Sequence, residues 1–345
     1  MKIHFKIKIL SFYTDTRRKK TKFATGRKRM VKKMQNKALE IIGEVKKAVV
    51  GKDEVIGKVL MVILAKGHIL LEDIPGVGKT TLALALSKAV SLDYKRLQFT
   101  PDVMPTDVTG FSVYNKQTGT LDYKSGAALC NLFLADEINR TSSKTQSALL
   151  EVMEEGSITV DGVTRRTPKP YIVIATQNPV GSAGTQLLPE SQLDRFMVRL
   201  TMGYPDLKDE MEILKRKQGA DPLESVRQVA SADDILAMQV QTESVYISDD
   251  VYRYIARLIA ATRENEMVRL GASPRGSIAL TKMAQAAAYL AGRDYVVPKD
   301  VQFVFSDVVQ HRILLSAQAK ISAATAASVL ESILRNVALP AVTGR

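Results

Sequence analysis

Residues 72–81 read EDIPGVGKTT, which has the form of a phosphate-binding loop between a strand and a helix. The pattern G-x-x-x-x-G-K-[ST] calls for glycine at position 73, where this chain has Asp73. Glycines let the backbone curl so that successive N–H groups point at phosphates, and the following helix adds its positive N-terminal end. Aspartate is among the few other residues that tolerate a positive φ or close a local turn with their own side chain. Asp73 is therefore compatible with a nucleotide site.

Each residue of the loop has an expected role. Gly76 and Gly78 supply the curvature, Lys79 reaches the β- and γ-phosphates of ATP, and a helix begins near Thr81. The Thr80 hydroxyl is a predicted Mg²⁺ ligand. The alternative is a strand–turn–helix without a ligand. The candidate nucleotide contacts in this stretch are Asp73, Pro75, Gly76, Val77, Gly78, Lys79, Thr80 and Thr81.

Three continuous apolar runs predict buried parallel strands covered by helices on both faces: HILLED (68–73), NLFLADE (131–137) and YIVIATQNP (171–179). Each run ends in polar residues, so a site is expected at the carboxyl ends of the strands. Asp136 is placed to hold Mg²⁺, and Glu137 to orient and deprotonate the attacking water. Asn178 is placed to sense the γ-phosphate or position that water, although by itself it also fits a turn.

The net charge of +13 is concentrated at the start of the chain. Residues 1–37 hold 14 of the 49 Lys and Arg and one of the 36 acids, so residues 38–345 carry 35 of each. This predicts a disordered basic tail over residues 1–37. The tail either contacts nucleic acid, anionic lipid or an acidic partner, or is a solvated extension whose true start is Met30 or Met34.

Composition excludes several other classes of protein. A single cysteine, Cys130, allows no internal disulfide, and the three histidines show no metal-ligand spacing, which fits a cytosolic protein. The longest apolar run, VLMVILA (59–65), is far shorter than the roughly 20 residues of a membrane span. No membrane insertion is expected.

Five ordered motifs, GVGKT, LFLADEINR, ATQNP, LPESQLDRF and GASPR, resemble those of AAA+ ATPases. The stretches QFTPDVMPTDVTG and SALLEVMEEGSITVDG are similar to the MoxR group, and the resemblance covers residues 38–345. It implies an α/β fold: an αβα core (38–204) with a five-stranded parallel sheet of order 5-1-4-3-2, and a helical lid domain (205–345). The resemblance also implies a hexameric ring with ATP between subunits.

The resemblance assigns further site residues. Residues 49–52, with Val50 and Gly51, would flank the adenine, although the family often has Gln where this chain has Lys52. Arg195 is similar to an arginine finger given to the neighbour's γ-phosphate. The alternative is a salt bridge to Asp194 or Glu190. Arg275 is similar to the sensor-2 arginine, acting either within its own subunit or across the interface.

Local signals predict several elements. Two β-hairpins are expected, one over residues 110–125 around NKQTG and one from Ser157 in SITVDGVTRR. Ser248 is a predicted N-cap, Pro274 begins a helix running to Gly292, and Pro298 begins another through Ile313.

The function expected from this resemblance is a chaperone-like ATPase that remodels or activates a partner. In MoxR relatives that partner is often a von Willebrand A domain protein, and sometimes a metal-cofactor enzyme. Alternatives are a nucleic-acid-handling AAA+ ATPase that uses the basic tail and a magnesium-chelatase-like subunit. The balanced charge of residues 38–345 favours the chaperone-like function over the nucleic-acid one.

Overall fold

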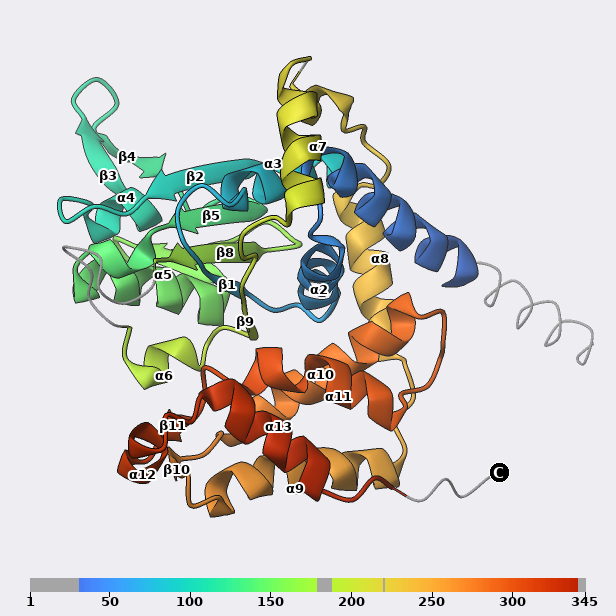
Figure 1. Cartoon of the computed structure of the whole chain (residues 1–345). Helices are drawn as coiled ribbons and strands as arrows, with labels where there is room; N and C mark the ends of the chain where they lie inside the picture. The colour runs from blue at the N-terminus through green and yellow to red at the C-terminus, as the bar shows by residue number, and fades with distance from the viewer. Residues whose placement is uncertain (1–30, 179–187, 220, 341–345) are drawn as a thin grey trace, which may run out of the picture.

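The structure, a computed structural model, describes residues 31–178, 188–219 and 221–340 of the chain. Its centre is a five-stranded parallel sheet in the order β2-β5-β8-β1-β9 (Figure 1). The strands are β1 (Ile69–Glu72), β2 (Tyr94–Gln98), β5 (Leu132–Asp136), β8 (Ile172–Gln177) and β9 (Val198–Leu200). Numbered along the chain as core strands one to five, they confirm the predicted order 5-1-4-3-2.

Alternate residues of the sheet face two hydrophobic cores. Leu71 packs in a core that includes α2 (Asp53–Leu64) and α3 (Lys79–Val90). Leu70 packs in a second core with α5 (Ser143–Glu155). Because helices cover both faces, β5 and β8 are buried along their whole length, which explains their continuous apolar runs.

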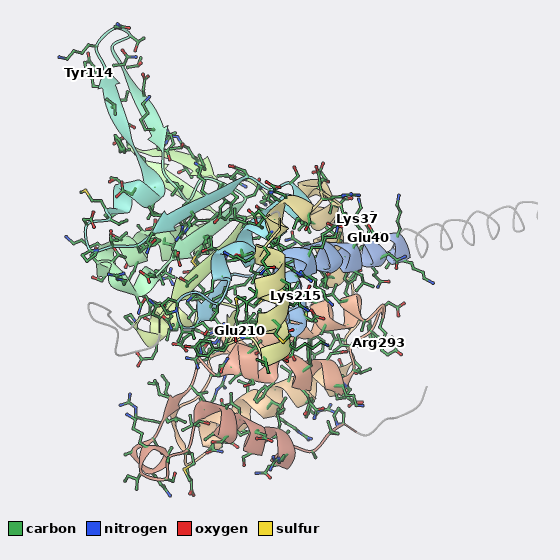
Figure 2. All side chains as sticks on the ribbon, turned by 45° about the horizontal axis from the view of Figure 1, so that its top comes forward. Lys37, Glu40, Tyr114, Glu210, Lys215 and Arg293 are labelled. Carbon is green, nitrogen blue, oxygen red and sulfur yellow. The ribbon has the colours of Figure 1, made fainter. Side chains whose placement is uncertain are left out.

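Both predicted hairpins are confirmed. The first follows α4 (Pro105–Thr109) and consists of β3 (Gly110–Asn115) and β4 (Thr120–Ser125), and the second of β6 (Ser157–Val160) and β7 (Val163–Arg166). Figure 2 shows the first hairpin projecting from the body of the molecule, with Tyr114 near its far end. Tyr114 is 61% exposed there, as is Leu121 opposite it on β4.

The rest of the chain is mostly helical. Ser248 caps α9 by accepting from Val251 N–H, and Pro274 and Pro298 begin α10 and α11, as predicted. These last two helices end at Leu290 and Val309, a few residues before the predicted ends. The remaining elements are η1 (Ile138–Arg140), α6 (Glu190–Leu193), α7 (Leu207–Lys217), η2 (Pro222–Ser225), α8 (Ala232–Glu243), α9 (Asp249–Glu264), β10 (Val268–Leu270), α10 (Pro274–Leu290), α11 (Pro298–Val309), β11 (Leu314–Leu315), α12 (Ala317–Ile321) and α13 (Ala326–Asn336).

The sheet-bearing part and the helical part share one core. Side chains of α2, α8 and α10 pack together in the same hydrophobic core as the sheet. Lys58 of α2 also forms an ion pair with Asp307 of α11, at 2.6 Å between Nζ and Oδ2. The two parts are therefore closely packed together. The domain boundary between a core of 38–204 and a lid of 205–345 remains a prediction.

The predicted tail boundary needs a correction. Residues 31–48 form one continuous helix, so residues 31–37 are ordered rather than part of a disordered tail. Met34 is buried in the core, and Lys37, labelled in Figure 2, forms a 2.6 Å ion pair with Asp234. Buried positions 34, 38, 41 and 45 follow the helical spacing. Residues 1–30 lie outside the described part of the chain.

None of the described helices combines the length and the apolar character needed to cross a bilayer.

Candidate nucleotide-binding and catalytic site

The loop between β1 and α3 has the backbone geometry of a phosphate cradle. Gly76 and Gly78 have φ values of 84° and 94°, in the region that L side chains rarely adopt. Gly78 is also the N-cap of α3, whose first turn contains no acidic residue. The free N–H groups and the positive end of the α3 dipole therefore face the loop, as anion binding requires.

Asp73 supports this loop in a way that corrects part of the prediction. Its φ is not positive, so it does not act as a substitute for glycine. Its carboxylate instead accepts from Ile74 N–H at 2.9 Å, which is the predicted local turn. The second carboxylate oxygen accepts from Met202 and Gly203 N–H, both at 2.6 Å. Asp73 thereby ties the phosphate loop to the segment that follows β9.

Lys79 is buried beneath the loop, and its amine donates to the Asp73 carbonyl at 2.8 Å. Burial lowers the pKa of this amine, while the negative charges of Asp73, Asp136 and Glu137 act in the opposite direction. The structure thus brings Lys79 into the field of both predicted catalytic carboxylates. Thr80 follows it in the first turn of α3, where it is half-buried.

One hydroxyl links the two acids at the end of β5. Thr176 donates to Asp136 Oδ1 at 2.6 Å and accepts from Glu137 N–H at 2.8 Å. Arg96 of β2 donates to the other Asp136 oxygen at 2.7 Å. Glu137 itself has φ 56° and ψ 47°, the left-handed region that is costly for a non-glycine residue. The hydrogen bond to Thr176 helps hold this conformation.

The Glu137 carboxylate is held by side chains from two neighbouring strand ends and from η1. Asn178 donates to Oε1 at 2.8 Å, and Arg140 donates to Oε2 at 2.7 Å. Gln98 adds a longer contact of 3.3 Å. Burial acts to raise the pKa of Glu137, but these hydrogen bonds outweigh it and hold the pKa below its usual value. The carboxylate is therefore ionised near neutral pH and can accept a proton.

A cavity of about 310 Å³ opens beside the loop. Val50 lines it as predicted, but Gly51 does not. Gly51 instead lies against α7, where a Cβ would be 1.7 Å from Asp209 Oδ2. Asp73, Pro75, Lys79 and Thr80 are also outside its lining. The residues that form the cavity wall are Ala48, Val49, Val50, Lys52, Gly76, Val77, Gly78, Thr81, Pro205, Ile213, Arg216, Lys217, Asp221, Pro222 and Leu223.

Part of this wall was not predicted. Ile213, Arg216 and Lys217 come from α7, an exposed helix with no buried residue. Arg216 fixes α7 over the site by donating to the Lys47 carbonyl at 2.5 Å. The only local signal is the basic last turn of the helix, LKRK, which does not by itself indicate a nucleotide contact.

The two predicted arginines lie together, away from this cavity. Glu154 of α5 pairs with Arg195 at 3.0 Å and with Arg275 of α10 at 2.5 Å. A second cavity of about 250 Å³ is lined by all three residues and shares no residue with the first. Among the described residues, the alternative salt bridge from Arg195 to Asp194 or Glu190 is absent: Arg195 pairs with Glu154 instead, and Asp194 pairs with Arg312 at 2.8 Å.

The donors present suit a hard cation that arrives with phosphates. The Thr80 hydroxyl and the Asp136 carboxylate offer oxygen, which Mg²⁺ prefers. Across the described residues, no group of three or more His, Cys, Asp or Glu could form an all-protein metal cage. Mg²⁺ normally takes one or two protein ligands and completes its shell with phosphate and water, so these residues fit it.

Comparisons with known proteins identify the family of this chain. The profile of the ATPase family associated with various cellular activities (AAA) matches residues 68–198, and that of the AAA lid domain matches 260–333. The uncharacterized protein YeaC of Bacillus subtilis is 47% identical, covering 88% of this chain and 94% of YeaC. Chaperone MoxR1 of Mycobacterium tuberculosis is 39% identical, covering 87% of this chain and 82% of MoxR1.

A solved structure extends the similarity to three dimensions. The crystal structure of a protein from Cytophaga hutchinsonii, named as a candidate ATPase, superposes with a TM-score of 0.84 at 38% identity. The match covers 90% of this chain and 96% of that one.

Proposed function

Because the chain belongs to the MoxR family of AAA+ ATPases, we propose that it binds ATP with Mg²⁺ and uses hydrolysis to remodel or activate a partner protein. The observation that carries this proposal is the convergence of Lys79, Asp136 and Glu137 at the carboxyl end of the sheet, where β5 and β1 lie on either side of β8. The family match favours this role over the nucleic-acid and magnesium-chelatase alternatives.

Nucleotide binding is assigned to the loop and the cavity beside it. The base and ribose occupy the cavity that includes Val50 and the α7 wall, and the phosphates run along the loop toward the N-terminus of α3. Lys79 leaves the Asp73 carbonyl to meet the β- and γ-phosphates. Thr80 and Asp136 hold Mg²⁺, which when bound neutralises charge on the phosphate oxygens.

Glu137 is the proposed base for hydrolysis. Its ionised carboxylate orients the attacking water and accepts a proton from it as the water attacks the γ-phosphorus, while the bond from the γ-phosphorus to the β–γ bridging oxygen breaks and ADP leaves. Asn178 donates to Oε1 of this carboxylate, so it positions the base, and its proposed second role is to sense the γ-phosphate. Arg140 and Gln98 hold the other oxygen, which limits rotation of the carboxylate.

The arginines are assigned to a neighbouring subunit's site. Arg195 and Arg275 pair with Glu154 in a second cavity, whose lining includes neither the phosphate loop nor the carboxylates at the end of β5, which supports action in trans for both. A planar guanidinium stabilises charge that develops on the transferred phosphoryl group. This arrangement requires a head-to-tail interface between identical subunits, and we propose that repeating it closes a hexameric ring.

The partner is proposed from the family and the surface. Relatives include a protein named as a chaperone, and the β3–β4 hairpin projects with exposed apolar side chains that include Tyr114 and Leu121. Such side chains suit contact with a protein partner. A von Willebrand A domain protein is the proposed class of partner.

Mixed rings test the shared active site. Arg195→Ala should bind ATP almost normally but hydrolyse it about 10³-fold more slowly. Glu137→Gln should also bind ATP but lose most of its hydrolysis. In a ring that mixes both variants equally, about one interface in four pairs an intact Glu137 with an intact Arg195. Part of the activity should return, whereas verified mixed rings without recovery would exclude a finger supplied in trans.

A further inference from the structure

Glu154 lies between two arginines that come from distant parts of the chain. It is the penultimate residue of α5, whereas Arg195 follows α6 and Arg275 stands in the first turn of α10. Glu154 Oε2 is 3.0 Å from Arg195 Nη1, and Oε1 accepts from Arg275 Nη2 at 2.5 Å. One carboxylate thus contacts the sheet-bearing part and the helical part of the molecule at the same time.

The surroundings of this pair are strongly cationic. The second cavity is lined by the basic side chains Lys66, Arg195, Arg275, Lys282 and Arg312. Its acidic lining residues are Glu154 and Asp194, and Asp194 is already bonded to Arg312 and to the Ser273 hydroxyl. Another cavity beside Arg195 is lined by Glu151, Glu154 and Glu155, but the carboxylate that pairs with both arginines is that of Glu154. Without it, the two like charges would lose the counter-ion that they share.

The contacts leave donors free for another ligand. Arg195 uses Nη1 for Glu154 and for the Leu150 carbonyl, and Arg275 uses Nη2 for Glu154. Arg195 Nε has no hydrogen-bond partner among the described residues but is buried, so the donors open to a ligand are those of the terminal nitrogens. A guanidinium carries five N–H donors, so each arginine keeps donors that match phosphate oxygens.

The three side chains are also open to a neighbour. Their exposed fractions are 37% for Glu154, 32% for Arg195 and 53% for Arg275. A carboxylate that is partly exposed holds these cations loosely enough for a triphosphate, with its higher charge, to engage them. Glu154 therefore orients the arginines without competing strongly for them.

We propose that Glu154 is a positioning residue that aligns Arg195 and Arg275 as one unit, presented to the triphosphate bound by the neighbouring copy of this chain. The proposal rests on the proposed function, because it assumes hydrolysis at a shared interface. Glu154 does not touch the nucleotide. It acts by fixing the two cations relative to each other, so its loss should affect the transition state more than ATP binding.

Steady-state kinetics of Glu154→Gln provide the first test. The variant keeps the size of the side chain but removes the charge, so kcat should fall at least about tenfold while KM for ATP changes by less than about twofold. Glu154→Asp, which keeps the charge, should recover part of kcat. Glu264→Gln at the end of α9 is the control for loss of a surface charge, because Glu264 is exposed and lines neither cavity beside Arg195. An unchanged or increased kcat in Glu154→Gln would overturn the proposal.

Mixed rings then locate the defect. If Glu154 acts together with Arg195, Glu154→Gln subunits should regain activity when mixed with Glu137→Gln subunits. They should not regain activity when mixed with Arg195→Ala subunits, because every subunit in the ring would then present a defective arginine unit to its neighbour. Recovery with Arg195→Ala but not with Glu137→Gln subunits would show that Glu154 acts on the nucleotide of its own subunit, and would refute the proposal. Recovery also shows that the Glu154→Gln subunit is folded.

The two proposals can fail separately. If the mixture of Arg195→Ala and Glu137→Gln recovers activity but Glu154→Gln is as fast as the unmodified protein, only the role of Glu154 is wrong. If the first mixture does not recover, the shared interface itself is wrong.

Discussion

Asp73 occupies the position where the phosphate-loop pattern has glycine, yet its backbone is not in the left-handed region that glycine would serve. The sequence allowed two explanations, a positive φ or a local turn, and the structure supports the turn. It also adds bonds to Met202 and Gly203, which are 129 and 130 residues away. A local sequence pattern gives no information on contacts between residues so far apart in the sequence, so this part of the role of Asp73 could not be predicted.

Restoring the glycine should therefore weaken the protein. Asp73→Gly conforms to the loop pattern but removes the acceptor of three backbone N–H groups, two of them beyond β9. We expect the free energy of unfolding to fall by about 3 kcal/mol, since buried donors lose a charged partner. Urea denaturation at neutral pH measures it. The free energy of unfolding of Asp73→Asn, which keeps one side-chain oxygen, should lie between those of the unmodified protein and Asp73→Gly. If Asp73→Gly were as stable as the unmodified protein, this account would be refuted.

The other site residues also divide into those that could be predicted from the sequence and those that could not. Asp136, Glu137 and Asn178 could be predicted because they directly follow buried apolar runs, and parallel strands end at one edge of the sheet. Arg96 could not, because β2 is an edge strand with the polar sequence YKRLQ. Nor could the left-handed backbone of Glu137, which depends on the Thr176 hydroxyl across the sheet.

At the scale of elements, strands were easier to predict than the placement of surface helices. Burial on both faces gives β5 and β8 a recognisable continuous apolar pattern. The exposed helix α7 has no buried residue, so its sequence does not show that it covers the nucleotide cavity. Residues 31–37 were assigned to the tail because of their charge, although Met34 already continued the helical spacing of the buried residues.

His68 joins three elements and gives the protein a pH-dependent stability. It precedes β1, accepts from Val173 N–H of β8 at 3.0 Å, and contacts the Met153 carbonyl of α5 at 3.0 Å. These partners require a neutral ring that donates from Nε2. Burial lowers the pKa of His68 to about 4, although the bond to Met153 opposes this shift.

The lowered pKa predicts a loss of stability on acidification. The unfolded chain binds a proton near its ordinary pKa of about 6.5, whereas the folded protein does so only near 4. Stability from this group is complete above about pH 6.5 and is lost as the pH falls toward 4, with about 2 kcal/mol lost by pH 5. Urea denaturation at pH 7.5 and pH 5 checks the difference.

A variant that cannot titrate is the control. His68→Gln should be less stable at pH 7.5 but lose less stability between pH 7.5 and pH 5. Some loss should remain, because burial also lowers the pKa of His311 well below its usual value. An identical pH dependence in both proteins would show that His68 does not contribute.

At the scale of the whole molecule, the residues of one proposed reaction lie at two separate places. Lys79, Asp136 and Glu137 are at the carboxyl end of the sheet, while Arg195 and Arg275 line another cavity with Glu154. Motifs identify both groups but give no relative position, so the sequence left open whether Arg275 acts within its subunit. The separation is explained if assembly brings one subunit's arginines to the next subunit's nucleotide.

Activity should therefore depend on protein concentration. In a monomer the nucleotide site has its base, but no neighbour supplies the arginines. The ATPase rate per subunit should therefore rise steeply with protein concentration and then level off once rings are complete. Light scattering should show ATP promoting assembly over the same range. Lys79→Ala, which loses the cation nearest the β- and γ-phosphates, should remain unassembled at ATP concentrations that assemble the unmodified protein. A constant rate per subunit in a preparation that stays monomeric would show that each subunit has a complete site, and would return Arg195 and Arg275 to a purely structural pairing with Glu154.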